Sequence, residues 1–296
     1  MQHLNLTHLH TFAQVIRLGS FSAAAERLGL TQPAVSLQIR QLETRLKLRL
    51  IERVGKRLKP TSAGETLLLH IGHIEAAVDN TLEALSSHAQ GVSGQVSIGT
   101  GATVCIHLLP PLLKILRKRF PELDVRVSTG NTDAMLKALE HNQLDIALVT
   151  LPASGRSLQV SPLLKDEFVA IFSQGHVDIP ACLSPEHLVA QPLVVFERGS
   201  STRLVIDEWF LKAGLRARPI MELGSIEAIK EMVAAGLGYS LVPRMAVAAS
   251  HHRRGLQVHS LGPPLVRSLA LVLRQDKPLG RGLNQVLQGL QGLADR

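Results

Sequence analysis

The residues best suited to bind a polyanion lie in the first sixty positions of the sequence. The chain has 296 residues and a net charge of +8, and residues 1–60 hold ten Lys or Arg against three Asp or Glu. Gln32, Ser36 and Arg40 follow one another at a spacing of four, which places them on one face of a helix. Such groups on a basic helix can contact the phosphates and base edges of DNA, although an ordinary solvated helix face can have the same composition.

Three short helices are expected to position these side chains. Apolar residues at helical spacing predict a helix over Leu6–Leu18, a second over Ala23–Leu28 capped by Ser22, and a third that begins after Thr31 and extends to Leu46. Two short helices joined by a glycine-containing turn are typical of a helix-turn-helix, whose second helix lies in the major groove of DNA.

A basic β-hairpin is expected directly after the third helix. Residues 50–60 form two short segments of alternating apolar and polar residues on either side of Gly55, a pattern typical of a hairpin. The basic side chains of this segment are Arg53, Lys56, Arg57 and Lys59. Such cations suit contact with phosphates or the minor groove, so residues 1–61 are interpreted as a winged helix-turn-helix domain.

Longer runs within this domain match a known family. They are Phe21-Ser22-Ala23-Ala24-Ala25-Glu26-Arg27-Leu28, Thr31-Gln32-Pro33-Ala34-Val35-Ser36, Gln38-Ile39-Arg40 and Pro60-Thr61-Ser62-Ala63-Gly64. Together they resemble the winged helix-turn-helix of LysR-type transcriptional regulators, and the resemblance implies sequence-specific binding to double-stranded DNA. The residues expected to contact DNA are Thr31, Gln32, Pro33, Ser36, Leu37, Arg40, Arg53, Lys56 and Arg57.

Three positions depart from the pattern of that family. Lys47 stands where the family usually has Gly, and Ile51 where it usually has Phe. Leu37 replaces a residue that is frequently basic or polar. An apolar side chain at this position could contact a thymine methyl group instead of a phosphate.

Residues 62–91 are expected to form a long linker helix. Leu67, Ile71, Ile74, Val78, Thr81 and Leu85 recur at alternating spacings of four and three, which is a heptad seam. The seam could pack on its own chain or on a second copy. The family resemblance implies a homodimer through this helix, which suits a pseudo-palindromic DNA site, and a homotetramer through the domains that follow.

Strands and helices alternate over residues 92–296, which predicts an α/β domain with a mostly parallel sheet. The resemblance implies an effector-binding domain of type 2 periplasmic-binding-protein architecture. Its first lobe is expected over 92–161 and 267–296, and its second over 162–266. The chain is thus expected to be a multi-domain protein with a winged helix-turn-helix head, a dimerisation helix and a two-lobed α/β domain.

Hydroxyl groups cluster where strands are expected to end and helices to begin. The residues expected to bind an effector are Thr100, Gly101, Ala102, Thr103, Thr129, Thr150, Ser200, Ser201, Thr202 and Ser225. Arg203 could add a positive charge. Helix N-termini favour anions, so a small anionic effector is expected between the lobes, although Ser and Thr also cap helices for stability alone.

Other classes of function find little support in the sequence. No metalloprotease, nucleophile-elbow or phosphate-loop motif is present, so no enzyme activity, cofactor or metal is expected. Cys105 and Cys182 leave a thiol redox sensor open as an alternative. A DNA binder with little sequence preference is a further alternative, which the Gln32, Ser36 and Arg40 face argues against.

Composition limits the partners and the location. Aromatic residues make up 3% of the chain, which argues against stacking on single-stranded nucleic acid. The sequence has no apolar run of the roughly 18 residues that a membrane span needs. Its first residues lack a basic segment followed by an apolar one, so no signal peptide is expected. The expected location is the bacterial cytoplasm, and RNA polymerase is a candidate further partner.

Overall fold

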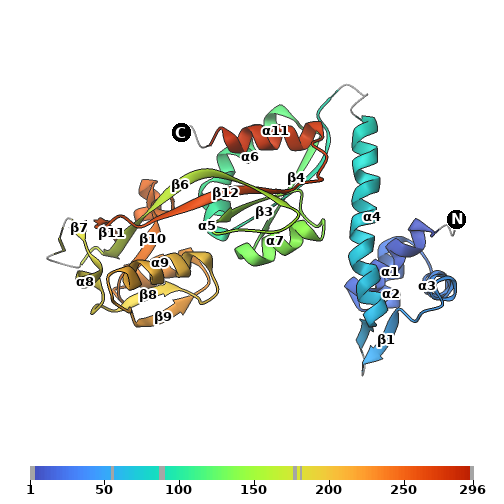
Figure 1. The fold of residues 1–296 in the computed structure, drawn as a ribbon, viewed down its shortest axis with the longest axis horizontal. Coiled ribbons are helices and arrows are strands. Elements are labelled where there is room, and N and C mark those ends of the chain that lie inside the picture. The colour runs from blue at the N-terminus through green and yellow to red at the C-terminus, as the bar shows by residue number, and fades with distance from the viewer. Residues whose placement is uncertain (1–3, 55–56, 87–90, 176–178, 181, 294–296) are drawn as a thin grey trace. The chain divides into compact units, whose positions relative to one another are not determined.

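The computed structural model describes residues 4–54, 57–86, 91–175, 179–180 and 182–293. By its internal contacts the chain divides into two compact units, Met1–Leu82 and Glu83–Arg296 (Figure 1). Within the described residues, no helix combines the length and apolar character that crossing a membrane requires.

Three helices and a hairpin form the start of the first unit. The helices are α1 (Leu6–Leu18), α2 (Phe21–Leu28) and α3 (Gln32–Leu46). Thr31 caps α3 as expected, accepting a hydrogen bond from the Ala34 N–H at 3.4 Å. The expected cap of α2 was wrong: Ser20, not Ser22, accepts from the Ala23 N–H, because the chain is still extended at Ser20 and is helical from Phe21.

The hairpin and a long helix complete this unit. Strands β1 (Ile51–Val54) and β2 (Arg57–Pro60) pair antiparallel, with Ile51 opposite Pro60, and α4 follows over Ser62–Ser86. The start of α4 packs closely on the chain before it. A Cβ added to Gly64 would lie 2.2 Å from the Leu50 carbonyl oxygen, so only glycine fits at this position.

The heptad seam of α4 has two different environments. Ile71 is buried in the core of the head with Phe12, Val35 and Leu42, and Leu67 and Ile74 pack against the same core. Val78, further along the seam, has 38% of its surface exposed. The first turns of the seam therefore pack on their own chain, and Val78 is available to a partner. The side chain of Leu85 lies outside the described residues.

The second unit is built around one large mixed sheet. Its strand order is β4-β3-β5-β12-β6-β11-β7, with β10 also paired to β6, while β8 and β9 pair separately. The strands are β3 (Gly94–Thr100), β4 (Leu123–Thr129), β5 (Ile146–Thr150), β6 (Leu158–Ser173), β7 (Cys182–Leu183), β8 (Leu193–Phe196), β9 (Pro219–Leu223), β10 (Ser240–Pro243), β11 (Leu256–Leu261) and β12 (Val266–Arg274).

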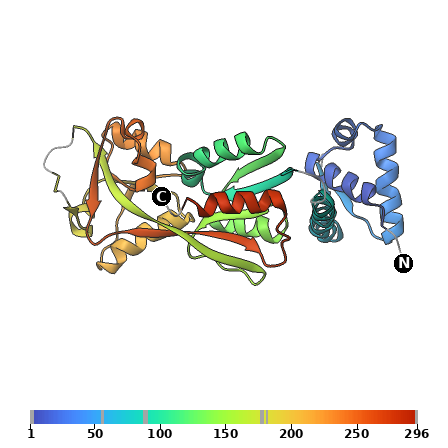
Figure 2. The same cartoon turned by 90° about the horizontal axis from the view of Figure 1, so that it is seen from above.

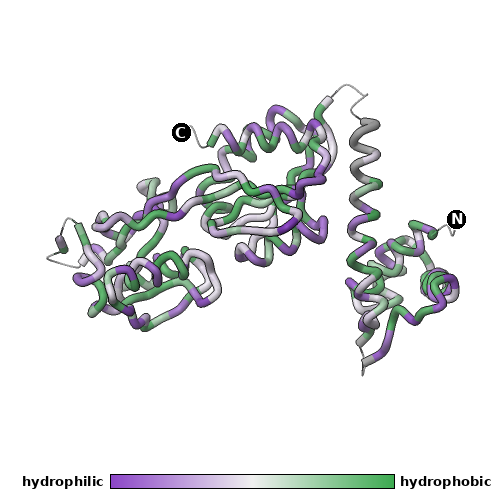
Figure 3. The backbone as a smooth tube through the Cα atoms, in the orientation of Figure 1, coloured by the Kyte–Doolittle hydropathy of each residue, from purple (hydrophilic) through white to green (hydrophobic). Residues whose placement is uncertain are grey.

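Helices cover these strands in two lobes. The first lobe contains β3–β5 and the second contains β7–β11. The first lobe has α5 (Ala102–His107), α6 (Leu109–Arg119), α7 (Thr132–Glu140) and α11 (Arg281–Gln291). The second has α8 (Pro185–Leu188), α9 (Ser201–Lys212), α10 (Ile226–Ala234) and the 3₁₀ turns η1 (Arg244–Val247) and η2 (Ser250–Arg253). Figure 3 shows hydrophobic and hydrophilic residues alternating along α11, as expected for a helix with one buried face.

Strands β6 and β12 join the lobes. They pair antiparallel from Val266–Glu167 to Arg274–Leu158, and Figure 2 shows them extending from one lobe into the other. The expected boundary between residues 161 and 162 falls inside β6. A mostly parallel sheet was also expected. Only part of the sheet is parallel, because β12 pairs antiparallel with β5 and β6, and β10 and β11 pair antiparallel with β6.

The backbone at Lys47 offers a test of local strain in the head. Lys47 ends α3 with φ +55°, in the left-handed region that side chains other than glycine rarely adopt. Replacing Lys47 with Gly is therefore expected to stabilise the head by about 1 kcal/mol, slowing native-state hydrogen exchange of the Val35 and Ile39 amides about fivefold. Lys47→Ala removes the same charge but keeps the strain, so equal slowing in both variants would contradict this explanation.

Candidate functional site

One face of α3 is buried and the other is polar and accessible. Val35, Ile39 and Leu42 lie in the core, with at most 4% of their surface exposed. The residues on the accessible face are Thr31, Gln32, Pro33, Leu37 and Arg40, which are exposed, and Ser36, which is half-buried. The Gln32 amide donates a hydrogen bond to the Ser36 hydroxyl at 2.9 Å. The face expected to contact DNA is thus the face that the fold leaves open.

Polar contacts fix α3 relative to its neighbours. The hydroxyl of Thr11, which is 1% exposed, donates to the Gln38 side chain at 2.6 Å and ties α1 to α3. The Glu43 carboxylate accepts hydrogen bonds from the backbone N–H groups of Leu50 and Ile51, at 2.8 Å and 3.4 Å. These bonds hold the start of the wing against α3, so the two elements form one surface.

The wing presents basic side chains on both of its strands. Arg53 is exposed on β1 and Lys59 on β2, in adjacent register positions on the paired strands. Lys56 and the side chain of Arg57 lie outside the described residues, so their expected contacts stay predictions.

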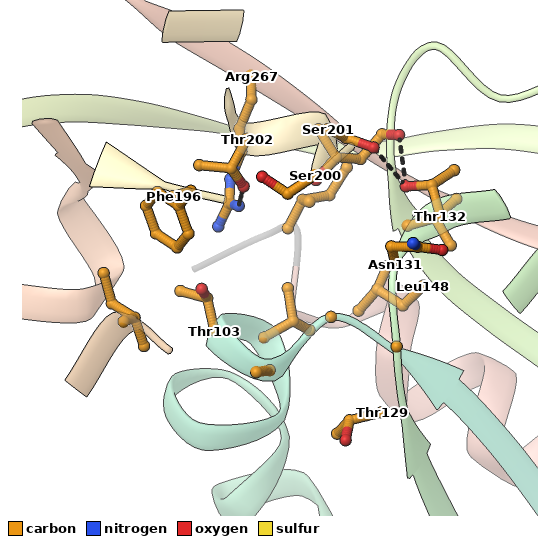
Figure 4. A pocket seen from close by; sticks show the side chains of 18 of the residues that line it. Thr103, Thr129, Asn131, Thr132, Leu148, Phe196, Ser200, Ser201, Thr202 and Arg267 are labelled. Atoms are coloured by element: carbon orange, nitrogen blue, oxygen red, sulfur yellow. Dashed lines mark hydrogen bonds between the residues drawn. The ribbon is translucent and has the colours of Figure 1, made fainter. Parts of the chain in front are cut away.

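A polar cavity of about 300 Å³ lies between the two lobes of the second unit. The ends of β3, β4, β5 and β8 and the beginnings of α5, α7, α9 and α10 surround it (Figure 4). A ligand there would meet N–H groups at helix N-termini, where the helix dipole favours negative charge. A cavity of this size suits a small molecule.

A chain of hydrogen bonds crosses the cavity from one lobe to the other. The Ser201 hydroxyl, at the start of α9, donates to the Thr132 hydroxyl, at the start of α7, at 2.8 Å. Thr132 in turn donates to the Thr150 carbonyl at 3.3 Å. Figure 4 shows Ser201 and Thr132 facing each other across the site. These hydrogen bonds connect the two lobes directly at the cavity.

A buried ion pair includes one of the residues that line the cavity. Arg267 of β12 lines it and donates to the Thr202 hydroxyl at 3.3 Å. The same guanidinium contacts the Asp166 carboxylate of β6 at 2.8 Å, with side-chain exposures of 3% and 5%. Burial lowers the pKa of Arg267 and raises the pKa of Asp166, and each charge opposes the shift of the other. Removing either residue would therefore leave the other as a buried charge without compensation.

Most of the expected effector-binding residues line the cavity. They are Gly101, Ala102, Thr103, Thr129, Thr150, Ser200, Ser201 and Thr202. The others have different places. Thr100 is fully buried and donates to the Leu148 carbonyl, and Ser225 is exposed and caps α10. Arg203 bonds to Asp207, Glu222 and the Phe196 carbonyl instead of lining the cavity.

Sequence reasoning missed four polar residues of the cavity, namely Asn131, Thr132, Glu197 and Arg267. Asn131 and Thr132 could have been recognised as the start of a helix after a strand, as Ser200 and Ser201 were. Arg267 gives no local signal, because only the β6–β12 pairing brings it to the site.

The described residues contain no group of three or more His, Cys, Asp or Glu placed to hold a metal ion. Cys105 is half-buried in the first lobe and Cys182 is exposed in the second, and both are free thiols.

A winged helix-turn-helix together with a two-lobed α/β domain that encloses a polar cavity defines a ligand-responsive transcriptional regulator. Residues 6–65 match the family "Bacterial regulatory helix-turn-helix protein, lysR family", and residues 89–294 match the "LysR substrate binding domain". The chain therefore belongs to the LysR family of transcriptional regulators.

Relatives and solved structures agree with this assignment. The chain is 31% identical over 281 residues to the HTH-type transcriptional activator CmpR of Synechocystis sp., covering 94% of this chain and 92% of CmpR. A full-length OxyR variant from Pseudomonas aeruginosa has a TM-score of 0.77 at 23% identity, covering 98% of each chain. Full-length CbnR complexed with target DNA has a TM-score of 0.75 at 20% identity, covering 98% of this chain and all of CbnR. These two structures support the fold.

The buried ion pair gives a prediction for stability. Arg267→Met leaves the Asp166 carboxylate buried without its partner and is expected to lower the free energy of unfolding of the second unit by about 3–5 kcal/mol in urea denaturation. The double variant Asp166→Leu, Arg267→Met removes both charges and should regain most of the loss. A single variant within about 1 kcal/mol of wild type would contradict the proposed dependence of each charge on the other.

Proposed function

We propose that this LysR-type regulator reads its DNA site with the accessible face of α3 and contacts the backbone with the wing. The exposure of Gln32 and Arg40 on the face opposite the buried side supports this assignment. Arginine and glutamine make bidentate contacts with guanine and adenine in the major groove. Leu37, 53% exposed beside them, suits contact with a thymine methyl group. Arg53 and Lys59 suit contact with phosphates, and the same role is proposed for Lys56 and Arg57.

The part of α4 beyond the head supports a homodimer. Val78 continues the seam beyond Leu67, Ile71 and Ile74, which pack on the head, and has 38% of its surface exposed. Packing this stretch of the seam against a second copy would bury Val78 and place two heads on a symmetric DNA site. A further pairing of the α/β domains into a tetramer, recruitment of RNA polymerase and action in the cytoplasm belong to the same proposal.

The effector proposed for the cavity is a small molecule with an acidic group. The main support is the series of hydrogen bonds from Ser201 to Thr132 and on to the Thr150 carbonyl. It places hydroxyls and the N-termini of α7 and α9 on opposite sides of one cavity. An acidic group between them would accept hydrogen bonds from both lobes. Glu197 lines the same cavity, so the best fit is a molecule that also carries a hydroxyl or amine to donate to this carboxylate.

Closure of the lobes is the proposed response to the effector. A ligand that bonds to both lobes binds the closed arrangement more tightly than the open one, and it can shift the DNA-bound assembly only by that difference in affinity. No feature of the described cavity indicates bond-breaking chemistry, so the proposed function is regulation without catalysis.

Arg40→Ala tests the proposed base contact. The variant is expected to bind the preferred duplex, selected from a random pool, about 1–3 kcal/mol more weakly and to lose discrimination at one base-pair position. Binding can be measured by fluorescence anisotropy at physiological salt. Arg17→Ala removes the same charge from the last turn of α1 and should keep the discrimination. An equal loss on selected and random duplexes for Arg40→Ala would rule out base reading by this residue.

Ser201→Ala tests the proposed effector contact. Small hydroxy and amino carboxylates, sulfur compounds and sugar phosphates are screened for a rise in the Tm of the wild-type protein. The effect of any hit should fall several-fold or disappear in Ser201→Ala, while binding to the selected duplex is retained. Ser260→Ala, an exposed serine of β11, is the matched control. A hit that stabilises Ser201→Ala as much as wild type would remove Ser201 from the site.

A further inference from the structure

A group of titratable side chains joins the two lobes beside the cavity. His107 ends α5 in the first lobe, and its side chain is 1% exposed. Its Nε2 lies 3.2 Å from Oε1 of Glu227, in the first turn of α10 in the second lobe. The ring of His252, in η2, lies edge-on to the His107 ring with 4.6 Å between centroids. The ring centroids of His251 and His252 are 3.9 Å apart.

The hydrogen bonding of this group is incomplete. The described residues contain five buried side-chain nitrogen or oxygen atoms without a hydrogen-bond partner, and four of them are here. They are both ring nitrogens of His107, Oε1 of Glu227 and Nδ1 of His252. The 3.2 Å contact between Nε2 of His107 and Oε1 of Glu227 is short enough for an ion pair but does not have the geometry of a hydrogen bond. Buried polar atoms are normally hydrogen-bonded, and each one without a partner lowers the stability of the fold. Four such atoms in one cluster therefore indicate a functional role.

The charge of Glu227 is already balanced within the second lobe. Its Oε2 accepts a hydrogen bond from the Lys230 ammonium at 2.8 Å, and the Lys230 side chain is 7% exposed. A proton on His107 would add a second positive charge to a buried cluster in which the Lys230 ammonium already balances Glu227. Burial lowers the pKa of His107 below its usual range, and His252 and Lys230 lower it further, whereas Glu227 opposes the shift. Burial also lowers the pKa of His252.

Charged groups on the other elements around α5 are engaged elsewhere or exposed. Arg244 of η1 pairs with Glu167, and Asp124 and Arg126 of β4 pair with each other. Arg253 of η2 donates to the backbone carbonyls of Val247 and Ala248. The basic residues of α6 are exposed, namely Lys114, Arg117, Lys118 and Arg119.

We propose that His107, packed against Glu227 and His252, is a pH-responsive latch that holds the lobes together when neutral and releases them when protonated. A histidine whose pKa is lowered in the closed arrangement stabilises that arrangement fully above the ordinary pKa of about 6.5, and the stabilisation is lost as the pH falls. Acid therefore opens the contact between α5 and α10.

The latch is placed to act on the effector cavity. Helix α5 begins with residues that line it, Ala102 and Thr103, and α10 begins with Ile226, which lines it as well. Releasing the far end of α5 from α10 would loosen both walls. This consequence rests on the proposed function, since it makes effector binding weaker in acid and makes effector binding expel a proton from His107.

Hydrogen exchange of the full-length protein, without effector or DNA, tests the latch. Amide exchange over residues 102–107 and 226–234 is compared at pH 7.5 and 5.5 after correction for the intrinsic rate. The wild type should exchange severalfold faster at pH 5.5, up to about tenfold for each unit of pKa difference. In His107→Gln, which stays neutral at both pH values, the corrected rates should be equal.

Two further measurements keep this test decisive. His259→Gln changes a half-buried histidine of the second lobe that packs on Phe172, and it should keep the wild-type pH response. Should His107→Gln fail to fold, titration of the wild-type histidine ring signals by NMR, with His252→Gln for assignment, must show a buried histidine that titrates below about pH 6.5. A pH-independent wild type, an unchanged response in His107→Gln, or no such histidine would each overturn the latch. None of these results depends on whether the cavity binds an effector.

Discussion

The antiparallel pairing of β6 with β12 is the constraint on which the ligand-binding unit depends. Both strands belong to both lobes, so the lobes can enclose a cavity while remaining one compact unit. The Asp166–Arg267 pair fixes the strands to each other where the cavity begins. Because both charges are buried, a shift of one strand against the other would leave a buried charge without its partner. The same guanidinium contacts Thr202 at the start of α9, so the joining strands and the cavity wall are linked directly.

The head depends on α3 having one side buried in the core and the other side accessible. Its helices are short, and α3 is held by a core that includes Phe12, Val35 and Ile71 of α4. Burial on one side leaves the polar side of α3 facing outward, and the Glu43 bonds to the wing keep α3 and the wing in one surface. A regulator needs this rigidity because side chains that are displaced by even small distances lose their contacts with base edges.

Local sequence patterns were enough to predict the head and the alternation of elements in the α/β domain. The periodicity of α1 and α3 and the turn at Gly29 are local signals, and they were read correctly apart from the cap at Ser20. The resemblance to the LysR family agreed with both family matches.

Features that depend on distant parts of the chain could not be predicted. Asp166 has no local signal of burial, yet it is buried in β6 through its pairing with Arg267, 101 positions away. In the cavity, the expected hydroxyls at Thr100 and Ser225 satisfy backbone groups instead, and Thr132 and Arg267 take part through tertiary contacts. Hydroxyl groups at strand ends thus located the cavity, but they could not tell which side chains point into it.

Thermodynamic linkage between the cavity and α3 is the most direct test of the whole account. With a small acid identified by its binding, its dissociation constant is measured by calorimetry for the free protein and for the protein bound to its selected duplex. The account predicts that DNA changes the affinity for the acid by the same factor by which the acid changes the affinity for DNA, and that this factor differs from one. An acid that binds the cavity tightly while both affinities stay unchanged would contradict it.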